Sequence, residues 1–161
     1  MLARMATAAR GFMVLLACSS CEKSPGTLGA AGPSAEVKTL GSIEVTARLE
    51  EIPDGAIFKR DLYDYTTILK YKVLKVHRGE VKGEEIFVGQ YNPFKPRSNA
   101  ADRYVQGIGG SVRRFEAGQV HRLALEVPLD DYFMGGVINK YFGKETGPLY
   151  WAVWTDPEAE R

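Results

Sequence analysis

The sequence predicts a mainly β protein, a single small antiparallel β-barrel of five to six strands with short helical turns, preceded by an N-terminal extension. Three observations predict it. From Val37 onward apolar and polar residues alternate with period two, glycine-containing turns interrupt the pattern at short intervals, and helical periodicity is weak. The chain has 161 residues, 45% hydrophobic and 25% charged, which suits one domain with one core.

The first predicted strand is SIEVTARLEEI. Ile43, Val45, Ala47 and Leu49 alternate with polar residues, the pattern of a half-buried strand. The turn residues Pro53-Asp54-Gly55 end it.

The second predicted strand, TTILKYKVLKVHRGE, changes face along its length. Leu69, Tyr71 and Val73 share one face, whereas Leu74 and Val76 fall on the other. We therefore expect a bulge near Val73 and Leu74 that restores one inward face and bends the strand at a barrel corner.

A hairpin follows. A polar turn flanked by Gly79 and Gly83 leads into a strand over residues 86–91, antiparallel to the second strand. Pro93 and Pro96 exclude a central strand after it, so NPFKPRSNAADRYVQGIGG is predicted to be a long loop, and a loop of that length suggests a functional role.

Two further strands complete the pattern. A turn at Ala117-Gly118 precedes a strand with inward His121, Leu123, Leu125 and Val127, and a last strand runs from Leu149 to Thr155, stopped by Asp156-Pro157. The segments SNAAD and DDYFMGGVINKYF each suit a helical turn. This strand number and spacing favour an OB-like barrel of about 120 residues.

The N-terminal residues are typical of an export signal. Arg4 and Arg10, without acidic residues, precede the apolar run GFMVLLA, which has signal-peptide rather than membrane-span length. The tetrapeptide LLAC ending at Cys18 resembles the lipobox of bacterial lipoproteins. The resemblance implies cleavage before Cys18, acylation of its thiol and a lipid anchor facing the periplasm, with Ser19 favouring the outer over the inner membrane.

The resulting organisation is a signal peptide over residues 1–17, a lipidated flexible linker over 18–36, a barrel over 37–157 and a tail over 158–161. Ser, Gly, Ala and Pro dominate the linker. Cys18 and Cys21 form a C-x-x-C pair at a cleavage site, which is not the setting of a redox centre, and His77 and His121 are not at zinc-ligand spacing. We expect no metal and no cofactor.

Charge excludes one class of partner. Lys plus Arg (21) and Asp plus Glu (20) give a net charge of +1, so no global field attracts nucleic acid.

The domain also resembles a known group of proteins. YKVLKVHRGEVKGEEIFV, then GQVHRLAL and GPLYWAV, are similar to netrin-module-like or OB-like barrels of bacterial envelope proteins. Some of these accompany SGNH and membrane O-acyltransferase proteins that acetylate exported polysaccharides and share an element like Asp61-Leu62-Tyr63. The resemblance implies a role beside such a polysaccharide-modifying assembly.

No catalytic motif is present: neither a G-x-S-x-G elbow nor an H-E-x-x-H helix occurs. The adjacent pairs Glu84-Glu85 and Asp130-Asp131 point to opposite faces of a strand and do not make an acid and base. His121 is expected to be a core or rim histidine.

Aromatic residues are the candidate binding groups, with the alternative that they fill the core. Rings stack on sugars while acidic and basic side chains reach hydroxyls or carboxylates. The candidate ligand-binding residues are Asp61, Tyr63, Tyr65, Arg97, Arg103 and Trp151.

The predicted function is a non-catalytic, lipid-anchored accessory protein of the cell envelope that binds a polysaccharide or a protein of a polysaccharide-modifying or export assembly. One alternative is an envelope hydrolase or esterase with a scattered site of His121, Asp61 and Ser111. Another is a structural barrel that recruits a partner by edge-strand pairing.

Overall fold

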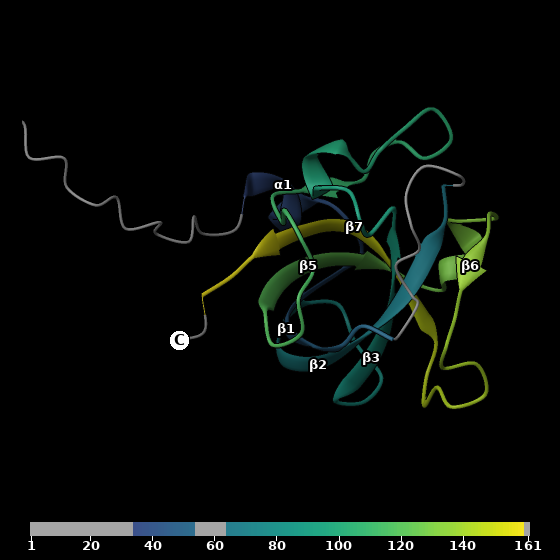
Figure 1. The fold of residues 1–161 in the computed structure, drawn as a ribbon. Helices are drawn as coiled ribbons and strands as arrows, with labels where there is room; N and C mark the ends of the chain where they lie inside the picture. The colour runs from purple at the N-terminus through teal and green to yellow at the C-terminus, as the bar shows by residue number, and fades with distance from the viewer. Residues whose placement is uncertain (1–33, 54–63, 160–161) are drawn as a thin grey trace, which may run out of the picture.

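The computed structural model describes residues 34–53 and 64–159 (Figure 1). Cys18, Asp61 and Tyr63, together with the expected signal peptide, lie outside the described residues. The elements in chain order are α1 (Ala35–Thr39), β1 (Ile43–Glu51), β2 (Thr66–Arg78), β3 (Glu85–Tyr91), the 3-10 turn η1 (Arg97–Asn99), β4 (Gly109–Gly110), β5 (Val120–Glu126), the 3-10 turn η2 (Leu129–Asp131), β6 (Val137–Ile138) and β7 (Leu149–Pro157).

Five long strands close into a barrel. Their order is β1-β5-β7-β3-β2, and β2 pairs back with β1 to close the sheet. Four neighbouring pairs are antiparallel, and β3 with β7 is the parallel pair. The short strands β4 and β6 add to β7 and β2. Figure 1 shows β5 and β7 curving side by side across the barrel. The prediction of a small OB-like barrel is confirmed, since five strands form a Greek-key barrel of this kind.

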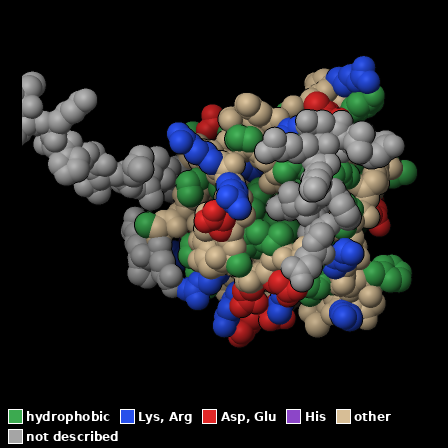
Figure 2. All heavy atoms as spheres, in the orientation of Figure 1, with side chains coloured by type: hydrophobic (Ala, Val, Ile, Leu, Met, Phe, Trp, Pro, Cys, Tyr) green, Lys and Arg blue, Asp and Glu red, His purple; other side chains and the backbone are tan. Residues whose placement is uncertain are grey.

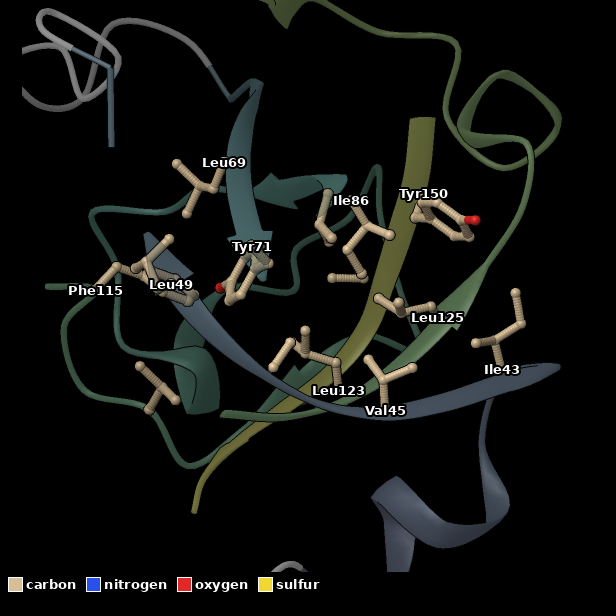
Figure 3. Packing of buried hydrophobic residues seen from close by; sticks show 14 residues of the cluster. Ile43, Val45, Leu49, Leu69, Tyr71, Ile86, Phe115, Leu123, Leu125 and Tyr150 are labelled. Carbon is tan, nitrogen blue, oxygen red and sulfur yellow. The ribbon is translucent and has the colours of Figure 1, made fainter. Parts of the chain in front are cut away.

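Alternate residues of each barrel strand point inward and form the main core (Figure 3). Val45, Leu69, Tyr71, Leu123 and Leu125 have none of their surface exposed. The period-two pattern of the sequence therefore marks the inward face correctly, because side chains on a strand alternate between the two faces of the sheet.

A second core lies outside the barrel wall. Phe87, Tyr91 and Trp151 point away from the barrel interior and pack with Phe133 and Ile108 from the connecting loops. Strands β3 and β7 are thus covered on both faces, by the barrel core inside and by loops outside. This second layer positions the groove described below.

The bulge expected in β2 is present. Thr46 and Ala47 of β1 pair with Lys75 and Val73, so Leu74 is the extra residue between them. The expected restoration of the inward face is wrong, because Leu74 is 42% exposed. Pairing between β2 and β3 ends at the register Lys72 with Glu85, so the end of β2 extends beyond the neighbour that would bury it.

Strand β7 runs further than the sequence indicates. It continues through Asp156 to Pro157, whereas the predicted end was Thr155. Strand β5 pairs with it to the last residue, in the register His121 with Pro157. A proline is tolerated at the end of a strand because its missing N–H is needed least there.

Short helical elements fall near the predicted segments. The 3-10 turns η1 and η2 begin one residue before SNAAD and DDYFMGGVINKYF, at Arg97 and Leu129. Helix α1, which the sequence pattern did not indicate, lies near the end of β7 (Figure 1). Its Val37 is fully buried, so the chain contacts the barrel from the beginning of the described region.

Candidate functional site

A groove of about 940 Å³ lies over the outer face of β3 and β7. Its walls are two loops, residues 103–108 after β3 and residues 132–135 after η2. Asp64, two residues before β2 begins, and Glu126, at the end of β5, also line it. The groove thus collects side chains from connections that are distant in sequence, among them those before β2, after β3 and after β5.

Stacked aromatic rings form its floor. The Phe133 ring lies 5.2 Å from that of Trp151, with an interplanar angle of 7°. The Tyr91 ring lies 5.4 Å from Phe133 and is tilted against it. Trp151 and Phe133 are only 4% and 8% exposed, so these rings are the support of the groove rather than its accessible surface.

The rim, in contrast, presents accessible apolar side chains. Tyr104 is 68% exposed, Tyr132 50% and Met134 94%, and all three line the groove. Isolated exposed apolar residues are normal on protein surfaces, but a group of them around one hollow is typical of a binding site.

Asp102 fixes one wall. Its Oδ1 accepts hydrogen bonds from the backbone N–H groups of Tyr104 and Val105, at 2.8 and 2.9 Å, and its Oδ2 accepts one from the Tyr91 hydroxyl at 2.8 Å. Although burial acts to raise the pKa of Asp102, these hydrogen bonds lower it below its ordinary value. Asp102 is therefore a carboxylate at neutral pH that holds the loop bearing Tyr104.

A second carboxyl group joins this wall. Asp64 lies against Asp102, and Lys95 Nζ lies 3.1 Å from Asp64 Oδ1. Burial, followed by the contact with Asp102, raises the pKa of the Tyr91 hydroxyl, which thus stays a hydrogen-bond donor.

Glu126 and Arg103 complete the polar rim. Glu126 Oε2 accepts hydrogen bonds from Ser42 Oγ at 2.5 Å and from the Tyr132 hydroxyl at 3.3 Å. Arg103 lies over the Tyr104 ring, 4.5 Å from its centroid. Each exposed tyrosine is thus paired with a charged side chain.

Of the candidates chosen from sequence, Arg103 and Trp151 meet in this groove. Tyr65 lies elsewhere, with its ring 6.1 Å from that of Phe94. Asp61 and Tyr63 are outside the described residues.

Arg97 lies inside the fold, with 2% of its surface exposed. Its Nη1 donates to Gln90 Oε1 at 2.9 Å, and its guanidinium lies 5.6 Å from the Phe115 ring centroid. Burial lowers its pKa to about 10, so the side chain remains a cation at neutral pH. Its position makes Arg97 an anchor of the loop after β3, and it does not line the groove.

The scattered hydrolase site is not assembled by the described residues. His121 is 1% exposed, and its ring nitrogens lie 3.2 Å from Tyr71 Oη and 3.1 Å from Gln119 Oε1. Ser111 Oγ donates instead to Asp156 Oδ1 at 2.7 Å. The histidine and the serine therefore have separate hydrogen-bond partners.

Sequence reasoning missed five residues that supply the floor and rim of the groove: Tyr91, Tyr104, Tyr132, Phe133 and Met134. One signal was available. The consecutive apolar run of β3, from Ile86 to Val88, is typical of a strand covered on both faces. It indicates a second layer over this wall of the barrel, though not its shape.

Within residues 34–53 and 64–159, no group of three or more His, Cys, Asp or Glu side chains is placed to hold a metal ion. The same ranges contain no helix with the length and hydropathy required to span a bilayer.

Figure 2 shows acidic and basic side chains intermixed over one face, as the balanced composition implies. In comparisons with known proteins, no family model, curated protein or solved structure matches this chain.

Proposed function

We propose that this chain is a non-catalytic, lipid-anchored accessory protein of the cell envelope that binds a polysaccharide in the groove. The observation that carries the proposal is the gathering of exposed Tyr104 and Tyr132, from two separate loops, over a buried aromatic floor and beside carboxylates.

The chemistry of the groove suits a sugar. Aromatic rings offer flat apolar faces to the C–H faces of a pyranose, while their hydroxyls and neighbouring carboxylates bond to sugar hydroxyls. Asp64 and Glu126 supply acceptors, and the Tyr104 and Tyr132 rings supply the faces.

The location of the groove also supports saccharide binding, by analogy with other barrels of this fold. OB-type barrels bind oligosaccharides and oligonucleotides on the face of their second and third strands and the adjoining loops. Here Tyr91 comes from the third barrel strand, Asp64 from the end of the first connection and Tyr132 from the connection before the last strand. The near-zero net charge disfavours nucleic acid.

The envelope location rests on sequence. The signal-like run before Cys18 and the LLAC tetrapeptide support an acylated N-terminus. The non-catalytic part of the proposal is supported by His121 and Ser111, which have other hydrogen-bond partners.

The test is a titration of the full-length protein in detergent with envelope oligosaccharides, native and deacetylated. A Trp154→Phe background leaves Trp151, in the groove floor, to report occupancy. We expect a saturable change of emission, and at least about fivefold weaker binding in Tyr104→Ala or Tyr132→Ala, because one stacking ring is worth about 1 kcal/mol or more.

Phe142→Ala is the matched control, since Phe142 is 86% exposed and does not line the groove. Equal losses in Phe142→Ala and Tyr104→Ala, or no saturable binding to any saccharide, would refute the assignment.

A second candidate function, recruitment of a protein by edge-strand pairing, is favoured by one observation. Within the described chain, β2 beyond Val73 pairs with β1 alone, and it exposes Leu74 and Val76. Such an edge is a template for an added strand. A second copy of the chain is the simplest partner to test. Sedimentation should then show a dimer that Leu74→Lys disrupts. A monomer at all concentrations would exclude a second copy as the partner.

A further inference from the structure

The geometry points to a ligand class for the groove: a saccharide without acidic groups, neutral or amino-bearing, in preference to a uronate-containing glycan. This inference rests on the proposed function and adds its charge selectivity.

Carboxylates outnumber basic side chains among the described residues that line the groove. Asp64 and Glu126 line it directly, and Asp102 stands behind the Tyr91 hydroxyl in contact with Asp64. The hydrogen bonds that Asp102 accepts from two backbone N–H groups fix the position of its carboxylate.

Two basic side chains near the start of the loop after β3 are engaged in other contacts. Lys95 Nζ lies 3.1 Å from Asp64 Oδ1 and 5.6 Å from the Phe94 ring centroid. Arg97 is buried inside the fold. Among the described residues that line the groove, Arg103 is the one basic side chain, and it lies over Tyr104.

Among the described residues, therefore, two carboxylates and one cation line the groove, and behind this lining Asp102 adds a carboxylate and Lys95 a cation. A uronate ring would place a further carboxylate among them, over an apolar floor where water screens charges less than in bulk. Sugar hydroxyls and ammonium groups, in contrast, are hydrogen-bond donors and match the acceptors Asp64 and Glu126. The charge pattern selects by repulsion as well as by attraction.

The test compares three oligosaccharides of equal length and linkage by calorimetry with the full-length protein in detergent. One is built of N-acetylglucosamine, one of glucosamine and one of glucuronate. We expect the first two to bind and the third to bind at least about tenfold more weakly, with the difference shrinking as salt rises from about 0.05 to 0.5 M.

Glu126→Gln keeps an acceptor for Ser42 and Tyr132 but removes the charge. It should narrow the discrimination against glucuronate by about threefold, a typical effect of one partly exposed charge. Glu80→Gln, an exposed change outside the groove, should leave the discrimination unaltered.

The outcomes separate the two proposals. Glucuronate binding as tightly as the neutral oligosaccharide, or discrimination that survives Glu126→Gln and high salt unchanged, overturns the charge selectivity and leaves saccharide binding standing. Failure of all three oligosaccharides to bind overturns both.

Discussion

The ring of Phe133 is stacked on the indole of Trp151, with centroids 5.2 Å apart and an interplanar angle of 7°. Phe133 comes from the loop after η2 and Trp151 from the outer face of β7. This contact fixes the loop that carries Tyr132 and Met134 onto the barrel wall. The aromatic floor is thus both the second core of the fold and the support of the groove.

Phe133→Ala should reduce the free energy of unfolding by about 3 kcal/mol, because truncating a buried phenylalanine loses transfer energy and leaves a cavity. Urea denaturation measures it. Phe142→Ala, at an 86% exposed position, should change stability by less than about 0.5 kcal/mol. Equal effects of the two substitutions would mean that the stacked pair contributes nothing specific.

The barrel was predictable from sequence because its strands are amphipathic. Ile43, Val45, Ala47 and Leu49 alternate with polar residues, and all four are buried. Even the bulge at Leu74 was visible as a change of face, whereas its exposure depends on where β3 ends, which periodicity does not report.

The groove was not predictable in the same way, because loops build it through long-range contacts. Arg97 was expected to reach a ligand as a loop cation, yet it bonds to Gln90 inside the fold. The sequence left two roles for Trp151, in the core or in a binding site. The residue is buried and also forms part of the groove floor. No local pattern indicates which loop residues fold back over a strand.

Stability should depend on pH through His121. Burial lowers its pKa to about 4, against 6.5 for an ordinary histidine, so the folded protein holds this ring neutral. Between pH 6.5 and 4 the unfolded chain binds a proton that the folded one does not. The stabilisation is therefore complete above pH 6.5 and declines as the pH falls to 4, by at most about 3 kcal/mol.

The free energy of unfolding, measured by urea titration at several pH values, should show this decline, and His121→Gln should flatten it. His77→Gln should flatten it less, since burial also lowers the pKa of His77, but this side chain is only half-buried and bonds to Thr46. If the slope between pH 6.5 and 4 is the same in His121→Gln as in the native protein, another group causes it.

Asp156 joins the first described residue to the barrel. It accepts hydrogen bonds from the backbone and side chain of Ser34, at 2.8 and 2.5 Å, and from those of Ser111, at 3.0 and 2.7 Å. Asp156→Ala leaves these donors unpaired and should cost about 2 kcal/mol or more. Because Trp154 Nε1 donates to Ser34 Oγ, its emission should shift to the red when Ser34 is released.

Burial acts to raise the pKa of Asp156, but the hydrogen bonds from Ser34 and Ser111 lower it below the ordinary 3.8. The contribution of Asp156 to stability is thus present above pH 3.8 and lost as the pH falls below that value. This loss occurs in a more acidic range than the one caused by His121. Asp130→Asn, at an exposed carboxyl, is the control for loss of charge alone. Unchanged Trp154 emission in Asp156→Ala would show that Ser34 stays in place without the carboxylate.

Gly89 sets the distance between β3 and η2. A Cβ at this position would lie 2.3 Å from Leu129 Cδ1 and 2.8 Å from Thr66 Cγ2. Leu129 is 1% exposed and has little room to move, so Gly89→Ala should push η2 outward and reduce stability by about 2 kcal/mol. Since η2 leads into Tyr132 and Phe133, saccharide affinity should fall with it. Gly136→Ala, where a Cβ meets nothing within 4 Å, should alter neither property. Loss of stability in Gly89→Ala with full saccharide affinity would show that the groove does not depend on the position of η2.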